Sequence, residues 1–152
     1  MKFEEFKLGQ TFKSHICISE YEFKQYISFA KVKSILHQNP QLAKNEGIKG
    51  ILLPGRAIIA RAEGEMTQLE AFSGNIMLLY GMDGDDNWNN RHTRFLNEAY
   101  VGDMLEVMYY VSDKREENTG RYGILSIDIQ IKRIHDNKLI LVSRRNLYRI
   151  KK

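Results

Sequence analysis

Two segments of the chain carry apolar residues at helical spacing, and the first lies over residues 19–31. Ser19 and Glu22 have the spacing of a capping box, in which the hydroxyl accepts one free backbone N–H and the carboxylate accepts another. Four apolar residues then recur at positions i, i+3, i+4 and i+7, namely Phe23, Tyr26, Ile27 and Ala30. The pattern predicts an amphipathic helix with one buried face.

The second helical segment is more apolar and opens at Pro54-Gly55. Its stripe runs through Ile58, Ile59, Ala62, Met66, Leu69 and Phe72, and Gly74-Asn75 is a plausible stop. Because the stripe covers a wide arc of the helix surface, we expect this helix to be largely buried.

After this second helix the pattern becomes that of strands. Residues 76–80 form a short apolar run, residues 104–111 are rich in β-formers, and residues 125–131 alternate apolar with polar positions. Residues 81–90 are polar and predict a loop, while residues 135–138 predict a turn before an extended segment over 139–150. Two helices followed by a long antiparallel meander make an α+β domain. A helix this apolar, wrapped by such a sheet, is the outline of the hotdog fold.

Composition limits the class of protein. The 152 residues are 43% hydrophobic and 28% charged, which predicts one globular domain over residues 1–152. The apolar runs are far shorter than the roughly 20 residues of a membrane span, and the first residues lack a signal-peptide stretch. Cys17 is the single cysteine, and no H-x-x-x-H or clustered Cys/His spacing occurs. We therefore expect a cytoplasmic protein without a disulfide, a metal site or a membrane partner.

The net charge of +4 is concentrated at the end of the chain. Residues 142–152 hold five basic residues and no acidic one, whereas residues 1–141 hold 18 basic and 19 acidic residues. Such a cluster suits nucleic acid, anionic lipid or a phosphorylated small molecule, or is a solvated strand face with a frayed tail. Since exposed aromatic residues do not alternate with it, we do not expect a nucleic-acid partner.

One longer motif resembles a known family. Residues 94–105 read R-F-L-N-E-A-Y-V-G-D-M-L, which is similar to the R-F-x-x-P-V-x-x-G-D-x-L signature of MaoC-like hotdog proteins, with Glu98 where proline is usual. Residues 6–12 look like the leading strand and glycine turn of the same family. The resemblance runs from about Phe3 to Ile150. It implies a relative of the (R)-specific enoyl-CoA hydratases and 3-hydroxyacyl dehydratases, which would bind an acyl-CoA or acyl-carrier-protein thioester, use no cofactor and form a homodimer or larger homo-oligomer.

The catalytic motif of those hydratases, D-x-N-P-x-H-x-D, is incomplete in this chain. One gap-free register places His37 on the catalytic histidine and Asn39 on the aspartate that follows it, but puts Val32 at the catalytic aspartate. A second register places His37 on the aspartate and Leu42 on the histidine, at the expense of a deletion before Gly47. In both registers the Asp–His dyad lacks a member.

Three functions remain open on these residues. A hydratase or dehydratase would use His37 as acid or base together with a non-standard partner. A hotdog thioesterase would instead use Glu63, which lies eight positions after Gly55 on the second helix; the alternative is that Glu63 and Glu65 face solvent or pair with arginines. The third possibility is a non-enzymatic protein that binds an acyl ligand or a partner subunit.

The resemblance also implies a binding site for the thioester group. In hotdog proteins the N-terminus of the central helix donates backbone N–H groups to the thioester carbonyl. In this chain that site would comprise Pro54, Gly55, Arg56 and Ala57, with Asn39 nearby by register. Arg56 and the C-terminal basic cluster would supply a positive rim for the phosphates or acidic surface of the thioester carrier.

Overall fold

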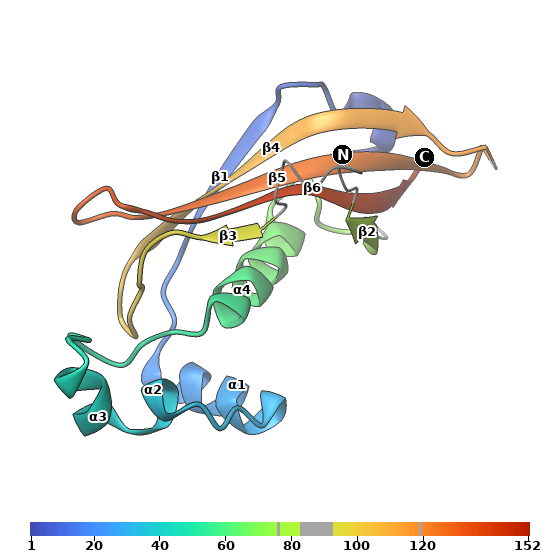
Figure 1. Cartoon of the computed structure of the whole chain (residues 1–152). Coiled ribbons are helices and arrows are strands. Elements are labelled where there is room, and N and C mark those ends of the chain that lie inside the picture. Colours follow the sequence, from blue (N-terminus) through green and yellow to red (C-terminus); the bar gives the residue numbers. More distant parts are fainter. Residues whose placement is uncertain (76, 83–92, 119) are drawn as a thin grey trace, which may run out of the picture.

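The computed structural model describes residues 1–75, 77–82, 93–118 and 120–152, and its elements follow the predicted order. A short 3₁₀ helix at Phe3–Glu5 precedes four helices and six strands (Figure 1). The helices are α1 (Glu20–Ala30), α2 (Ile35–Gln38), α3 (Pro40–Asn45) and α4 (Gly55–Gln68). The strands are β1 (Thr11–Ile16), β2 (Met77–Met82), β3 (Thr93–Phe95), β4 (Leu105–Glu116), β5 (Tyr122–Arg133) and β6 (Leu139–Lys151).

The strands form one antiparallel sheet that curves over α4. Its order is β1-β4-β5-β6-β2, and β3 pairs with β6 further along the same edge. The long strands β4, β5 and β6 make the centre of the sheet, and α4 lies beneath its concave face (Figure 1). This arrangement confirms the predicted α+β hotdog fold.

The core fills the space between the sheet and α4. On β4, buried residues alternate with more exposed ones from Leu105 to Val111, as expected for a strand with one covered face. On α4, the predicted stripe residues Ile58, Ala62 and Met66 are buried. The hydroxyl of Tyr109 donates a 2.6 Å hydrogen bond to the carbonyl of Ala62, which joins β4 to the middle of the helix.

Helices α1, α2 and α3 gather beyond the N-terminal end of α4 (Figure 1). The predicted capping box starts α1: Ser19 Oγ accepts the Glu22 N–H, and the Glu22 carboxylate accepts the Ser19 N–H, each at 3.1 Å. The chain leaves α3, runs through an isolated bridge between Leu52 and Tyr100, and enters α4. This path places the end of α2 close to the start of α4.

Two local predictions differ from the structure. The helix predicted to reach Gly74 ends at Gln68, because Leu69 has an extended backbone; Phe72 is nevertheless buried, in the turns that follow. Of the loop predicted over residues 81–90, Gly81 and Met82 belong to β2 and the remainder lies outside the described residues.

A bulge in β6 breaks the alternation of side chains along this strand. Arg145 has a left-handed backbone with φ of 56°, and its N–H donates to the Asp128 carboxylate at 2.8 Å. The pairing with β5 shifts at this point, so that Asn146 is buried while Arg144 is exposed. A regular strand would place Arg144 and Asn146 on one side, but here they differ in burial, since a bulge adds a residue to one strand and turns the following side chains.

Candidate active site

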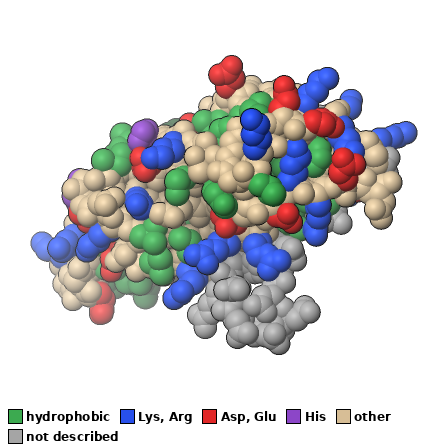
Figure 2. Space-filling model, turned by 90° about the horizontal axis from the view of Figure 1, so that it is seen from above, with side chains coloured by type: hydrophobic (Ala, Val, Ile, Leu, Met, Phe, Trp, Pro, Cys, Tyr) green, Lys and Arg blue, Asp and Glu red, His purple; other side chains and the backbone are tan. Residues whose placement is uncertain are grey.

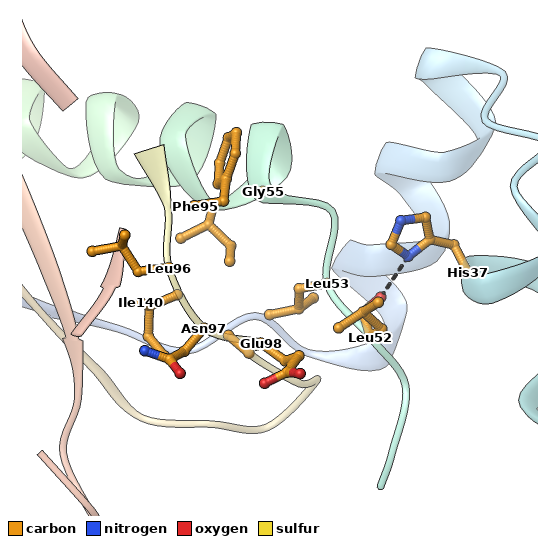
Figure 3. A pocket seen from close by; sticks show the side chains of 11 residues that line it. His37, Leu52, Leu53, Gly55, Phe95, Leu96, Asn97, Glu98 and Ile140 are labelled. Carbon is orange, nitrogen blue, oxygen red and sulfur yellow. Dashed lines mark hydrogen bonds between the residues drawn. The ribbon is translucent and has the colours of Figure 1, made fainter. Parts of the chain in front are cut away.

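A cavity of about 350 Å³ opens between α2, the start of α4 and the segment that follows β3. Its apolar wall consists of Leu52, Leu53, Ile58, Phe95, Leu96, Ala99 and Ile140, together with Gly55. Three polar side chains complete the lining, namely His37, Asn97 and Glu98 (Figure 3). An apolar chamber with a few polar groups is the usual form of a small-molecule site.

His37 is held at the edge of this cavity by the backbone. Its Nδ1 lies 2.9 Å from the carbonyl oxygen of Leu52 (Figure 3). Because a carbonyl can only accept, this contact makes Nδ1 the protonated nitrogen and leaves Nε2 for other partners. The half-buried imidazole is therefore fixed in position and tautomer by the segment that leads into α4.

No carboxylate completes a dyad with His37 in the described part of the chain. Val32, at the family's aspartate position, contributes only its backbone carbonyl, which accepts a 2.7 Å hydrogen bond from Gln38 Nε2. Glu98 is the carboxylate that shares the cavity lining. In Figure 3 the Leu52–Leu53 segment lies between His37 and Glu98, so the two groups face the cavity from different sides.

The backbone that carries Glu98 is held by a buried arginine. Arg133, with 7% of its surface exposed, donates from Nη1 to the Glu98 carbonyl at 2.8 Å and to Asp103 at 3.2 Å. It also donates to Asp136 from Nη2 at 2.9 Å. This hydrogen bond from Arg133 lowers the pKa of Asp136 to about 2, and the pKa of Arg133 is raised in turn. The side chain of Glu98 forms no hydrogen bond to any described residue and is exposed, so it is available to a ligand.

The first turn of α4 reaches the cavity at Gly55. Pro54 is the N-cap and offers no side-chain oxygen, while its carbonyl accepts from the amides of Ala57 and Ile58. The amides of Gly55 and Arg56 donate to no group within the described residues. Free N–H groups at the start of a helix favour an oxygen with negative character.

An aromatic ring covers Gly55. A Cβ built on Gly55 would coincide with the ring of Phe95, so the absence of a side chain is what allows the ring to lie against α4 (Figure 3). We expected Gly55 to be part of a thioester site. In the structure, Phe95 from β3 fills the space that a side chain on Gly55 would occupy.

The other residues proposed for binding lie outside the cavity lining. Asn39 is exposed and caps α3, where its side-chain oxygen accepts from the amides of Gln41 and Leu42. Arg56 is exposed on the first turn of α4, whereas Ala57 is buried in the core. Of the predicted site residues, His37 and Gly55 line one cavity.

Glu63 lies further along α4 and has its own partner. The buried hydroxyl of Tyr148 on β6 donates to Glu63 Oε1 at 2.5 Å. Burial and the hydrogen bond to Glu63 raise the pKa of Tyr148 well above its ordinary value. Glu65 instead accepts from Arg61 at 3.0 Å and from Ser14 at 2.8 Å, so the arginine pairing considered for this residue is present. Neither carboxylate lines the His37 cavity.

The C-terminal basic cluster does not form a rim for the cavity. Arg149 pairs with Glu117 and lies over the ring of Tyr122, and Lys152 pairs with Glu116 at 2.7 Å. Seen over the outer side of the sheet, Lys and Arg side chains are interspersed with Asp and Glu (Figure 2). None of the five basic residues from 142 onward is part of the cavity lining.

Within residues 1–75, 77–82, 93–118 and 120–152, no group of three His, Cys, Asp or Glu side chains is placed to hold a metal ion. In the same residues, no helix has the length and apolarity needed to cross a membrane.

Sequence reasoning missed the contribution of residues 95–99 to the cavity. The resemblance identified this segment as a fold motif, but its side chains Phe95, Leu96, Asn97 and Glu98 supply a large part of the lining. One signal was available, since Glu98 replaces the proline of the motif with an ionisable group.

Comparisons with known proteins agree with the geometry at the level of the fold. No family model matches the sequence, and no curated protein matches it. Among solved structures, an Archaeoglobus protein described as a monoamine oxidase regulatory protein superposes with a TM-score of 0.77 at 18% identity, covering 99% of this chain and 92% of that one. An (R)-hydratase from A. caviae involved in PHA biosynthesis gives 0.72 at 17% identity over 97% and 98% of the two chains.

A MaoC-like dehydratase from Rhodospirillum rubrum gives a TM-score of 0.73 at 13% identity, over 100% of this chain and 98% of that one. A further neighbour, from Mycobacterium tuberculosis, is described as having a double hotdog fold. These similarities extend over nearly the whole chain, so the sheet, α4 and the helices before it are all part of the shared architecture. The chain has the hotdog fold of the MaoC-like dehydratases and (R)-hydratases.

Proposed function

We propose that the chain binds an acyl thioester, carried by CoA or by an acyl carrier protein, in the cavity between His37 and the start of α4. The observation that carries the proposal is the composition of this cavity: an apolar chamber, the first residue of α4 with its free amide, and an imidazole meet at one place in a hotdog fold. The hydratases and dehydratases of the same fold provide independent support for this ligand class.

The apolar part and the polar part of the lining would together orient the bound acyl thioester. The acyl chain would lie against Ile58, Leu53 and Ile140, whose burial makes them a firm floor. The thioester oxygen would accept a hydrogen bond from the amide of Gly55, which the helix dipole reinforces.

On this ligand, the chemistry we propose is hydration of a 2,3-enoyl thioester or the reverse dehydration. Water adds its oxygen to C3 while a proton is delivered to C2, and the reverse reaction removes the same proton and hydroxyl. Each step needs one acid or base within reach. Nε2 of His37 would serve one step, and the carboxylate of Glu98 would take the place of the missing aspartate for the other.

The test of this proposal is an assay of the purified protein with crotonyl-CoA. Loss of the enoyl absorbance together with formation of 3-hydroxybutyryl-CoA is the expected result. Thermal stabilisation by crotonyl-CoA without turnover would leave the binding function and remove the hydratase chemistry. If crotonyl-CoA is not turned over and does not stabilise the protein, the binding function and the hydratase chemistry are both overturned.

A second candidate, hydrolysis of the thioester, rests on the contact between Glu63 and Tyr148. A carboxylate that is half-buried on the central helix and held by a buried phenol is a positioned group suited to act as a base. Thiol release from acyl-CoA that Glu63→Gln abolishes would favour this function. Thiol release that persists in the variant, or no release by the wild-type protein, would remove it.

We also propose a homodimer. Strand β2 is at the end of the strand order. Among the described residues, β6 is the strand that pairs with it, so the other edge of β2 is open to pairing with a second copy. Light scattering coupled to gel filtration would show twice the 17.8 kDa of one chain. A mass of one chain at micromolar concentration would contradict this assembly.

A further inference from the structure

We infer that the carrier of the acyl group is CoA, and that its nucleotide part binds in a second cavity between α3 and the loop that follows it. The inference rests on the proposed function and adds the class of carrier. The second cavity has a volume of about 570 Å³. Its wall combines the apolar residues Pro40, Ile48 and Ile51 with two lysines, Lys44 and Lys49.

The second cavity lies within reach of the acyl cavity for one pantetheine arm. Ile51 lines the second cavity, and the next residue, Leu52, lines the acyl cavity. Gly55, whose amide we assign to the thioester oxygen, follows Ile51 by four positions, so their Cα atoms are at most about 15 Å apart. The extended arm of CoA has about 13 bonds between its sulfur and its first phosphorus, and at about 1.2 Å per bond it spans about 16 Å. One CoA thioester can therefore occupy both cavities.

Lys44 and Lys49 carry positive charge that the protein itself leaves unpaired. Both are exposed, and within the described residues neither side chain forms an ion pair or a hydrogen bond. The backbone amides of Lys49 and Gly50 also donate to no described group. Ammonium groups and free N–H groups around one cavity are donors that suit phosphate oxygens. The C-terminal basic residues Arg149 and Lys152 differ in this respect, because carboxylates of the protein already pair with them.

The charge of the surrounding helices favours the same kind of ligand. Residues 23–56, which run from α1 to the first turn of α4, hold six basic residues and one acidic residue, Glu46, a net charge of +5. Glu46 is not part of the cavity lining. A segment with this excess of positive charge attracts a polyanion.

The number of phosphates distinguishes CoA from an acyl carrier protein. CoA has a pyrophosphate and a 3′-phosphate beside an adenine ring, whereas the arm of a carrier protein ends in a single phosphodiester. Two lysines and two free amides offer more donors than one phosphodiester needs. The apolar wall of the cavity suits the face of the adenine ring. The lining therefore fits CoA better than the carrier protein.

The test is calorimetric titration with butyryl-CoA and with butyryl-pantetheine, which has the same acyl group and arm but no nucleotide. We expect the wild-type protein to bind butyryl-CoA at least tenfold more tightly, with a preference that weakens as the salt concentration rises. In the double variant Lys44→Met/Lys49→Met, affinity for butyryl-CoA should fall by about tenfold and affinity for butyryl-pantetheine should not change. The matched control is Lys24→Met/Lys33→Met, which removes two exposed lysines of the same segment outside the cavity lining and should keep the wild-type affinities.

The outcomes separate this inference from the proposed function. Butyryl-pantetheine that binds the wild-type protein as tightly as butyryl-CoA overturns the inference, as does a Lys44→Met/Lys49→Met variant that binds butyryl-CoA like the control; in both cases binding of butyryl-CoA upholds the proposed function. Butyryl-acyl carrier protein that binds more tightly than butyryl-CoA also overturns the inference and upholds the proposed function. If none of the three thioesters binds, the proposed function and this inference are overturned together.

Discussion

Glu98 and His37 line one cavity from two sides of the Leu52–Leu53 segment. The two residues are fixed by the same piece of backbone: the Leu52 carbonyl accepts from His37 Nδ1, and the Leu53 amide donates to the carbonyl of Ala99, the neighbour of Glu98. A ligand in the cavity would meet an imidazole on one side of this segment and a carboxylate on the other, without the sequence motif that normally supplies this pair.

Replacing Glu98 by glutamine tests whether its carboxylate takes part in the reaction. We expect kcat for crotonyl-CoA hydration to fall by about 10²-fold or more with little change in KM, because an amide cannot exchange the proton. Glu46→Gln, at an exposed position after α3, is the control. An unchanged kcat in Glu98→Gln would exclude this carboxylate from the chemistry.

Replacing His37 by alanine should lower kcat by about 10²- to 10⁴-fold, since Nε2 is then lost as an acid or base. Stability should fall by only about 1 kcal/mol, because the hydrogen bond to the Leu52 carbonyl is the protein contact that the side chain loses. Steady-state kinetics and urea unfolding measure the two effects. Full activity in His37→Ala, matching an exposed-histidine control such as His135→Ala, would contradict the assigned role.

Replacing Arg133 by methionine should destabilise the protein by about 3 kcal/mol, because two carboxylates and the Glu98 carbonyl lose their shared donor. Urea unfolding at neutral pH checks the value. Arg115→Met, at an exposed position on β4, should change stability by less than about 1 kcal/mol. Equal effects of the two substitutions would show that the buried network does not stabilise the fold.

The lowered pKa of Asp136 predicts that the folded protein loses stability in acid. Its pKa is lowered from 3.8 to about 2 in the folded protein, so the unfolded chain takes up the proton first as the pH falls. The contribution is present above pH 4 and is lost as the pH falls to about 2. In Asp136→Asn, the unfolding midpoint in urea should therefore depend less on pH over this range. The same dependence in variant and wild type would contradict the lowered pKa.

The raised pKa of Tyr148 predicts that the folded protein loses stability in base. Its pKa is raised in the folded protein by burial and by Glu63, so the unfolded chain ionises first once the pH exceeds about 10. The contribution is complete below pH 10 and is lost above it. Tyr148→Phe should be less stable by about 2 kcal/mol at pH 7 and should lose less stability than the wild type between pH 9.5 and 11. A parallel loss in both proteins would contradict the assignment.

Local pattern was sufficient to predict the elements that form the core. The capping box of Ser19 and Glu22 and the stripe of Ile58, Ala62 and Met66 are short-range features, and each has a direct physical meaning that the structure confirms. The bulge at Arg145 was not predictable in this way. It depends on a carboxylate on the neighbouring strand, Asp128, that accepts the displaced backbone amide.

In the cavity, too, some features were predictable from the sequence and others depend on residues far apart in the chain. His37 was predicted from the register of a motif; it lines the cavity, and its role in catalysis stays a prediction. The ring of Phe95 on Gly55 joins residues 40 positions apart, so no local pattern could indicate it. The backbone of Glu98 is likewise held by a hydrogen bond that Arg133 donates from β5, 35 positions along the chain. The missing dyad was visible in the sequence, whereas the groups that could replace it became visible only with the fold.

The central claim is that the cavity recognises the acyl group of a thioester. Calorimetric titration of crotonyl-CoA and of free CoA into the same wild-type protein tests it most directly, because the two ligands differ only in the group that would enter the cavity. We predict that crotonyl-CoA binds at least tenfold more tightly than CoA. Equal affinities, or no binding of crotonyl-CoA, would contradict the account.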